Sequence, residues 1–192
     1  MLIGKLLSPI HSLGPGTRAG LWTQGCNKNC KGCISPELKS KNPKKDIPME
    51  LLTGILRSGA KRNNCDRLTI SGGDPFEQPE ELCRLLKEIR KDFKDILVYT
   101  GFLYEQIADG SLGEAAREAL EYIDVLIDGP YIEEQNVPEA VLRGSKNQRN
   151  IYLNPDRRDE YEDYLKQGRQ LENFVHNNEV CTVGILNKEE TP

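Results

Sequence analysis

Three closely spaced cysteines are the strongest chemical feature of this sequence. Cys26, Cys30 and Cys33 follow a C-x3-C-x2-C spacing, whereas the other three cysteines are scattered along the 192 residues. Clustered cysteines in a chain without an export signal indicate a metal or redox site, because disulfides are rare in reducing compartments. Thiolates are the usual protein ligands of iron–sulfur clusters. Three of them could hold a 4Fe–4S cluster and leave the fourth iron open for chemistry, as a catalytic zinc keeps an open position.

Two other uses of these thiols remain open. A structural zinc site would need a fourth ligand, which Cys65 or His11 could provide. Cys30 and Cys33 could instead form a thioredoxin-like redox pair, although that leaves Cys26 without a role. The triad alone therefore favours an iron–sulfur cluster and does not exclude zinc.

The composition is that of a well-charged globular chain. The 26 Lys and Arg residues stand against 30 Asp and Glu, which gives a net charge of −4, and 37% of the residues are hydrophobic. A mildly acidic chain gives no indication of binding to nucleic acid or anionic membranes, which requires clustered Lys and Arg. No stretch approaches the ~20 apolar residues of a membrane span, and the first residues lack a signal-peptide pattern. We therefore expect one cytoplasmic protein with no nucleic-acid or membrane partner.

The apolar pattern alternates between segments typical of strands and of helices. Leu51, Leu52, Ile55 and Leu56 are expected to form the apolar face of the first helix. Alternation at this spacing favours βαβ units and a mainly parallel sheet. The expected strands cover residues 2–10, 19–25, 67–74, 95–101 and 123–131, and the expected helices cover residues 48–61, 79–92 and 113–122.

Four segments with chemical potential follow predicted strands. These are the cysteine loop and residues 72–74 (Gly-Gly-Asp), 99–101 (Tyr-Thr-Gly) and 128–130 (Asp-Gly-Pro). Taken singly, the Gly-Gly-Asp and Asp-Gly segments would be turns. In sheets with parallel strands, however, ligands bind outside the carboxyl ends of the strands. We therefore expect the four segments to converge on one rim of the sheet.

Residues 14–33 (GPGTRAGLWTQGCNKNCKGC) resemble the cluster-binding start of the radical S-adenosylmethionine (SAM) enzymes that activate glycyl radical proteins. Residues 143–149 (RGSKNQR) resemble an RGSxNQR stretch of the branch that acts on anaerobic ribonucleotide reductases. The likeness extends over residues 12–153. It implies that Cys26, Cys30 and Cys33 hold a 4Fe–4S cluster whose open iron binds SAM.

The same resemblance implies a binding site for the rest of SAM. Gly72, Gly73 and Asp74 would hold the methionine amino group, and Thr100 and Asp128 would belong to later cofactor-binding motifs. The residue types fit, because paired glycines permit close backbone approach and a carboxylate pairs with an ammonium.

The activity that the resemblance implies is reductive cleavage of SAM to a 5′-deoxyadenosyl radical. The radical would install a glycyl radical on a partner enzyme such as an anaerobic ribonucleotide reductase, with electrons from a flavodoxin- or ferredoxin-type donor. Many superfamily members place an aromatic residue before the third cysteine, near adenine, but this chain has Gly32 there. An adenine platform must therefore come from elsewhere. The alternatives are a stand-alone radical SAM enzyme acting on a peptide or small molecule, and a non-catalytic iron–sulfur or zinc protein.

The expected fold is α/β: a partial (β/α) barrel with an open side and a mainly parallel sheet, because the chain is short for a closed barrel. We expect a radical SAM core over residues 1–154. Residues 155–192 are very polar and are expected to form a charged C-terminal extension that packs on or flanks the core. Within it, residues 181–186 (CTVGIL) are expected to add an edge strand.

Overall fold

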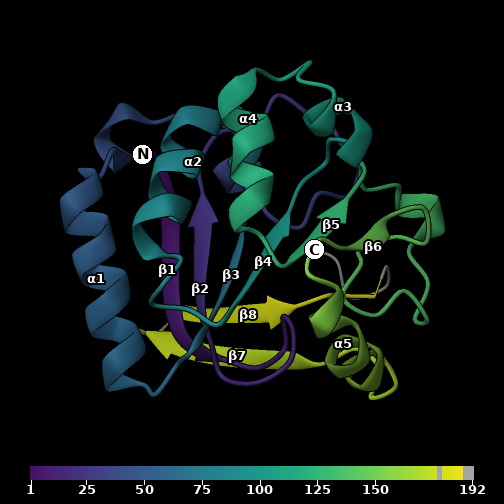
Figure 1. Cartoon of the computed structure of the whole chain (residues 1–192). Helices are drawn as coiled ribbons and strands as arrows, with labels where there is room; N and C mark the ends of the chain where they lie inside the picture. Colours follow the sequence, from purple (N-terminus) through teal and green to yellow (C-terminus); the bar gives the residue numbers. More distant parts are fainter. Residues whose placement is uncertain (177–178, 188–192) are drawn as a thin grey trace.

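The computed structural model describes residues 1–176 and 179–187, and its centre is an open sheet of six strands in the order β1-β2-β3-β4-β5-β6. Strands β2 to β5 are parallel, while β1 and β6 run antiparallel to their neighbours. The expectation of an open, mainly parallel α/β sheet is confirmed (Figure 1). The strands are β1 Ile3–Ile10, β2 Arg18–Thr23, β3 Arg67–Gly72, β4 Asp95–Tyr99, β5 Val125–Asp128 and β6 Arg149–Tyr152.

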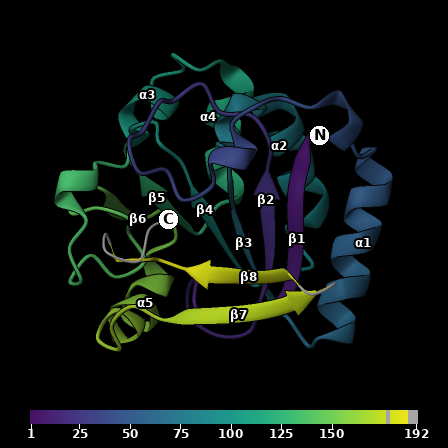
Figure 2. The same cartoon turned by 180° about the vertical axis from the view of Figure 1, so that it is seen from behind.

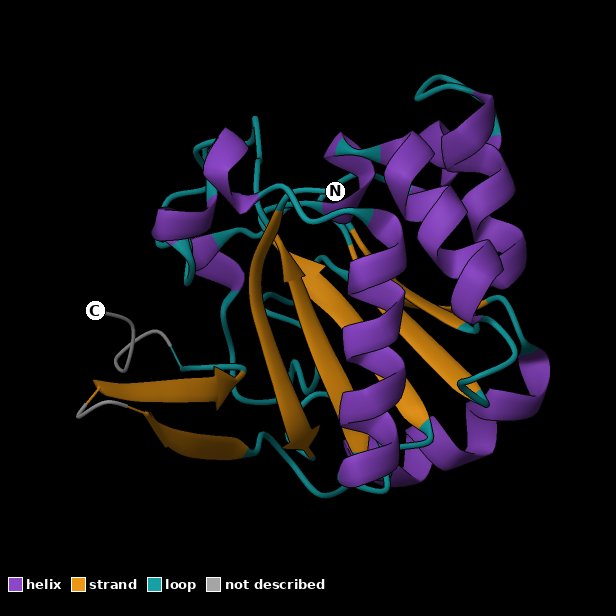
Figure 3. Cartoon of the chain, turned by 90° about the vertical axis from the view of Figure 1, so that its left-hand side faces the viewer, coloured by secondary structure: helices purple, strands orange, loops and turns teal. Residues whose placement is uncertain are grey.

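The helices that connect the parallel strands cover one face of the sheet (Figure 3). They are α1 Met49–Arg62, α2 Pro79–Ile89, α3 Tyr104–Ala108 and α4 Glu114–Ala119. In α2 the apolar face is fully buried, namely Leu82, Leu85, Leu86 and Ile89. Among the described residues, no helix is long and apolar enough to cross a membrane.

The predicted apolar face of α1 was half wrong. Leu52 and Leu56 are buried, but Leu51 and Ile55 are 56% and 41% exposed. The buried stripe turns instead toward Met49, Thr53 and Ala60. Helix α1 lies over β1 and β2 at the edge of the sheet (Figure 1). A helix at that edge has a neighbouring helix on one side only, so its buried stripe is narrower than the apolar pattern suggests.

The C-terminal part of the chain forms helix α5, Arg158–Leu165, and a hairpin of β7, Leu171–His176, and β8, Glu179–Gly184. A strand was expected near residues 181–186, but β8 pairs with β7 in a separate two-stranded sheet and does not extend the main one. The edge beside β5 is taken by β6, which the sequence pattern did not predict. The hairpin crosses the face of the main sheet that α1 and α2 leave uncovered (Figure 2). Residues 177–178 and 188–192 of the expected extension lie outside the described residues.

A buried ion pair joins the amino ends of the parallel strands. The guanidinium of Arg18 donates to the Asp95 carboxylate at 2.6 Å, to Leu68 O at 2.7 Å and to Thr69 Oγ1 at 2.5 Å. The Tyr161 hydroxyl of α5 donates to the same carboxylate at 2.8 Å. Arg18 and Asp95 are both fully buried. Helix α5 is therefore joined to the sheet by a hydrogen bond to a buried ion pair.

Candidate functional site

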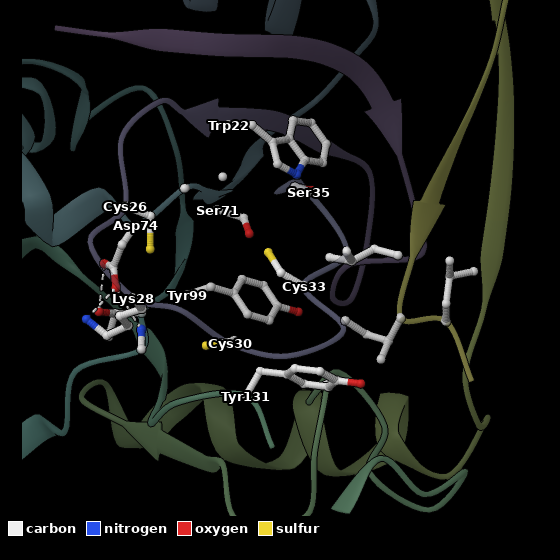
Figure 4. A pocket seen from close by; sticks show the side chains of 18 of the residues that line it. Trp22, Cys26, Lys28, Cys30, Cys33, Ser35, Ser71, Asp74, Tyr99 and Tyr131 are labelled. Carbon is white, nitrogen blue, oxygen red and sulfur yellow. Dashed lines mark hydrogen bonds and ion pairs between the residues drawn. The ribbon is translucent and has the colours of Figure 1, made fainter. Parts of the chain in front are cut away.

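The cysteine loop follows β2 and lies over the carboxyl ends of the parallel strands. Cys26, Cys30 and Cys33 are all partly buried, and all three line a cavity of about 530 Å³. In Figure 4 their sulfur atoms are spread around this cavity and do not meet at one point. The predicted rim is thus present, because residues 71–74, 99–101 and 129 line the same cavity.

The paired glycines after β3 hold the cysteine loop in place. Gly72 has a φ of +123°, and a Cβ on it would lie 2.2 Å from Thr23 N. A Cβ on Gly73 would lie 2.4 Å from Gly25 O. The backbone N–H groups of Gly73 and Asp74 donate to Thr23 O at 2.9 Å and to Gly25 O at 3.0 Å. Only glycine permits this close approach, so part of the motif's role is to position the start of the cysteine loop.

Asp74 is 2% exposed and lies at one end of the cavity. Its Oδ1 accepts hydrogen bonds from Thr100 Oγ1 at 2.9 Å and from Phe76 N at 3.1 Å. Its Oδ2 accepts one from Gly101 N at 2.9 Å and lies 3.3 Å from Lys28 Nζ. Burial raises the pKa of Asp74, while the Lys28 ammonium and these donors oppose the shift. The site therefore holds a buried carboxylate beside a single ammonium.

Asp128 is not brought together with the other predicted residues. Its carboxylate is fully buried outside the cavity lining. It accepts from Tyr104 N at 2.7 Å and from Arg149 Nε at 3.0 Å, and it also accepts from the second guanidinium nitrogen of Arg149. Asp128 thus fastens the start of α3 to β6, and only the neighbouring Gly129 faces the cavity.

Residues 143–149 support the rim. Gln148 Oε1 accepts from Gly144 N at 2.8 Å and from Ser145 N at 3.2 Å, and Gln148 Nε2 donates to Gly129 O at 2.9 Å. Gly144 and Gln148 themselves line the cavity. The glutamine amide therefore uses both its ends to hold the loop after β5 against the site.

The C-terminal hairpin supplies a wall that the sequence did not reveal. Residues 182–186 line the cavity together with the apolar side chains of Leu13 and Trp22. The hairpin is held by Ser12 Oγ, which donates to Val183 O at 3.1 Å, and by Asn136 Nδ2, which donates to Leu186 O at 3.2 Å. In Figure 4 this ribbon borders the cavity across from Asp74 and Lys28. The cavity thus has one end with the Asp74–Lys28 pair and another formed mainly by apolar side chains, with the Lys5 ammonium 5.9 Å from the centre of the Trp22 ring. The apolar run of residues 183–186 was the one sequence signal for the second end.

Tyr99 presents a hydroxyl without a partner. Its ring lies among the three cysteines in Figure 4, and within the described part of the chain its buried hydroxyl has no hydrogen-bond partner. Burial raises the pKa of Tyr99 well above its ordinary value, so the hydroxyl stays protonated and remains a donor. An unpaired buried donor costs about 1–3 kcal/mol. This orphaned group fits a cavity that takes a ligand with a hydrogen-bond acceptor.

The donor set fits a cluster better than a single zinc ion. In residues 1–176 and 179–187, no three His, Cys, Asp or Glu side chains converge on one ion position. A zinc ion needs its ligands within about 2.0–2.3 Å, whereas a cubane cluster binds each thiolate at a different iron. The two fourth ligands considered for zinc are elsewhere: Cys65 is buried after α1, and His11 contacts Glu172 at 3.0 Å.

The surroundings of Cys26 also fit a cluster. Desolvation by burial is the main cause that raises the pKa of the Cys26 thiol. The neighbouring Lys28 opposes this shift of the pKa, and coordination to a metal ion would stabilise the thiolate further.

Comparison with known proteins gives one family match, two relatives and one solved structure. A family model described as "4Fe-4S single cluster domain" matches residues 12–151. The anaerobic ribonucleoside-triphosphate reductase-activating protein of Haemophilus influenzae is 35% identical over 143 residues, which cover 70% of this chain and 87% of that protein. The protein of the same name from Enterobacteria phage T4 is 34% identical over 148 residues, with coverages of 74% and 88%. The crystal structure of QueE from Escherichia coli matches with a TM-score of 0.43 and 14% identity, over 66% of this chain and 69% of that one.

Proposed function

The chain belongs to the family of single-cluster 4Fe–4S domains and to the radical SAM enzymes related to anaerobic ribonucleoside-triphosphate reductase-activating proteins, and we propose that it installs a glycyl radical on a partner enzyme. The observation that carries this proposal is the placement of three thiols, a buried carboxylate and an orphaned hydroxyl donor around one cavity. An anaerobic ribonucleotide reductase is the proposed partner. The two relatives match this chain over most of their own length, and both are named as activating proteins of that enzyme.

Cys26, Cys30 and Cys33 would hold the cluster through their thiolates. When bound and reduced, a 4Fe–4S cluster supplies the electron that cleaves the carbon–sulfur bond of SAM. Asp74 would pair with the ligand ammonium, and the positions of Gly72, Gly73 and Thr100 would fix that carboxylate. The shared cavity at the carboxyl ends of the parallel strands, which all of these residues line, supports this assignment.

Water exclusion is the task of the opposite end of the cavity. Leu13, Trp22 and the residues of β8 present apolar groups there. Apolar side chains that exclude water strengthen the electrostatic interactions inside the site and keep solvent from a reactive intermediate. The hairpin and the cysteine loop would therefore act together, the loop by holding the reagents and the hairpin by enclosing them.

We also propose a cytoplasmic location and a flavodoxin- or ferredoxin-type electron donor. All six cysteines are free thiols in the structure, and thiolate ligands of a cluster must stay reduced before iron binds. A protein donor of low potential suits a partly exposed cysteine loop at the molecular rim. Nucleic acid and membranes are not among the proposed partners, because the net charge of −4 offers them no general attraction.

The test is anaerobic reconstitution with iron and sulfide, followed by reduction in the presence of SAM. We expect 5′-deoxyadenosine from the native chain and none from Cys30→Ala. Cys65→Ala is the matched control, because Cys65 lies outside the cavity lining, and it should retain the product. A tightly bound zinc ion without product from the native chain would sink the proposal.

A second arm addresses the partner. Addition of an anaerobic ribonucleotide reductase should give a glycyl radical signal by electron paramagnetic resonance. Formation of 5′-deoxyadenosine without that signal would leave a radical SAM enzyme with another substrate.

A further inference from the structure

The carboxylate of Asp74 is surrounded by the folded frame and by one cation. Three hydrogen bonds come from the frame: Thr100 Oγ1, Phe76 N and Gly101 N. The ammonium of Lys28 forms an ion pair with Oδ2 at 3.3 Å. Asp74 is only 2% exposed, and Lys28 and Asp74 both line the cavity. A ligand ammonium that approaches Oδ2 from the cavity therefore meets the ammonium of Lys28.

Lys28 is the member of this group that can leave. It lies in the cysteine loop between Cys26 and Cys30, and its side chain is 20% exposed, against 2% for Asp74. Its ammonium lies 3.0 Å from the centre of the Phe102 ring, and a Cβ on Gly101 would lie 2.4 Å from its Cδ. The lysine thus passes over Gly101 to reach the carboxylate, and Figure 4 shows Lys28 beside Asp74. Lysine carries its charge on a flexible four-carbon stem, which suits such a reversible contact.

Exchange of one ammonium for another keeps the buried charge paired. Removing a cation from a buried carboxylate is strongly unfavourable, since an uncompensated charge remains. Replacing Lys28 by the ammonium of an amino-acid ligand avoids this loss, because the new cation takes over the same oxygen. The three donors of the frame need not move.

We propose that Lys28 is a resident counter-ion of Asp74 that holds the ligand's ammonium position and leaves it when SAM binds. The inference rests on the proposed function, since it takes Asp74 as the place where the ligand's ammonium binds. Lys28 then competes with SAM for one carboxylate oxygen. On binding, its ammonium moves to solvent beside the cysteine loop.

The direct test is chemical labelling of lysines in the reconstituted native chain. An acylating reagent is applied with and without saturating SAM, and modification is measured residue by residue by mass spectrometry. We expect the labelling rate of Lys28 to rise several-fold with SAM. Lys166 is the matched control, since it is also ion-paired, at 2.7 Å from Asp163, and lies on α5 outside the cavity lining. An unchanged or lower rate at Lys28, with SAM bound, would overturn the exchange.

A binding measurement gives the second readout. Lys28→Gln should bind SAM several-fold more tightly than the native chain, because its competitor is gone, while Lys166→Gln should match the native chain. Weaker binding by Lys28→Gln would mean that the lysine assists the ligand, which contradicts the proposal. If the native chain shows no saturable SAM binding at all, the proposed function fails as well. Saturable binding without release of Lys28 overturns this inference alone.

Discussion

The two ends of the parallel strands carry the same kind of ion pair in opposite settings. At the amino ends, Arg18 and Asp95 are both fully buried and 2.6 Å apart. At the carboxyl ends, Asp74 is equally buried, but its partner Lys28 comes from a loop and is partly exposed. The first pair is closed on all sides by the fold and the second opens onto a cavity. Burial of the carboxylate is therefore common to both pairs, and the pairs differ in the exposure of the cation and in its access to a cavity.

The choice of cation follows this division. The planar guanidinium of Arg18 donates in several fixed directions, to a carboxylate, two backbone carbonyls and a hydroxyl. Lys28 contributes one charge from a flexible stem. Mutations at the amino ends should therefore change stability, and mutations at the carboxyl ends should change binding.

The largest expected effect is at the amino ends. Arg18→Met should lower the free energy of unfolding by about 3 kcal/mol, because the buried Asp95 loses its nearest cation and keeps only the more distant Arg67 guanidinium, at 4.0 Å. Urea unfolding followed by circular dichroism measures this loss. The molecules that remain folded should bind SAM with unchanged affinity. A specific loss of binding in the folded fraction would contradict the division between the two ends.

The corresponding change at the carboxyl ends should act on binding. Asp74→Asn removes the charge that attracts the ligand ammonium, and we expect a loss of SAM affinity of about 10- to 100-fold, as for a hydrogen bond to a charged group. Isothermal titration calorimetry on the reconstituted protein measures it. Asp109→Asn is the control, because Asp109 accepts from Ser111 in an exposed turn outside the cavity lining. Equal losses in both variants would show that the effect is not local.

Two matched tyrosine changes sharpen the comparison. Tyr161→Phe removes the hydroxyl that donates to Asp95 and should cost about 1.5 kcal/mol of stability. Tyr99→Phe removes a hydroxyl without a partner in the described residues, so its stability should be unchanged or slightly higher. Thermal unfolding of both variants beside the native chain provides the measurement. A larger loss of stability for Tyr99→Phe than for Tyr161→Phe would mean that the Tyr99 hydroxyl stabilises the folded state.

The smallest expected effect is a response of the hairpin to acid. Burial pushes the pKa of Glu172 upward, but the N–H groups of His11 and Ser12 outweigh it, and the net pKa lies below its ordinary value of 4.5. A lowered carboxyl pKa gives stability that is present above the ordinary value and is lost as the pH falls through the folded value. Acid below that range should therefore loosen the hairpin.

Trp22 can report this loosening. It is the only tryptophan of the chain and packs in one cluster with Val183 of β8. Its fluorescence should change as the pH falls below 4.5 in the native chain, and Glu172→Gln should remove that step. A fluorescence change of the same size in Glu172→Gln would show that other carboxylates cause the acid response.

Much of the fold and rim could be predicted because the signals are local. Strand and helix periodicity located β2 to β5 and α2, and the parallel order of the strands placed the cysteines near Asp74. The exposed side of α1 could not be predicted, since periodicity does not show how many neighbours a helix has. Asp128 was assigned to the cofactor site from its motif, but its partner Arg149 lies 21 residues later and draws the carboxylate away from the cavity.

The remaining failures have the same origin in long-range contacts. No motif marks Lys28 as the partner of Asp74, because the two are joined only when the cysteine loop folds over the rim. The wall from β8 lies more than 140 residues from the cysteines in the chain. Local pattern does not record such a contact, and the family match ends at residue 151, before the wall begins.

The position of that wall in the chain has a consequence for folding. More than 140 residues separate β8 from the cysteine loop, and contacts between segments so far apart in the chain form slowly. The main sheet without the docked hairpin leaves Leu13 and Trp22 without that wall. We therefore expect the cavity to be among the last parts of the structure to be completed during folding.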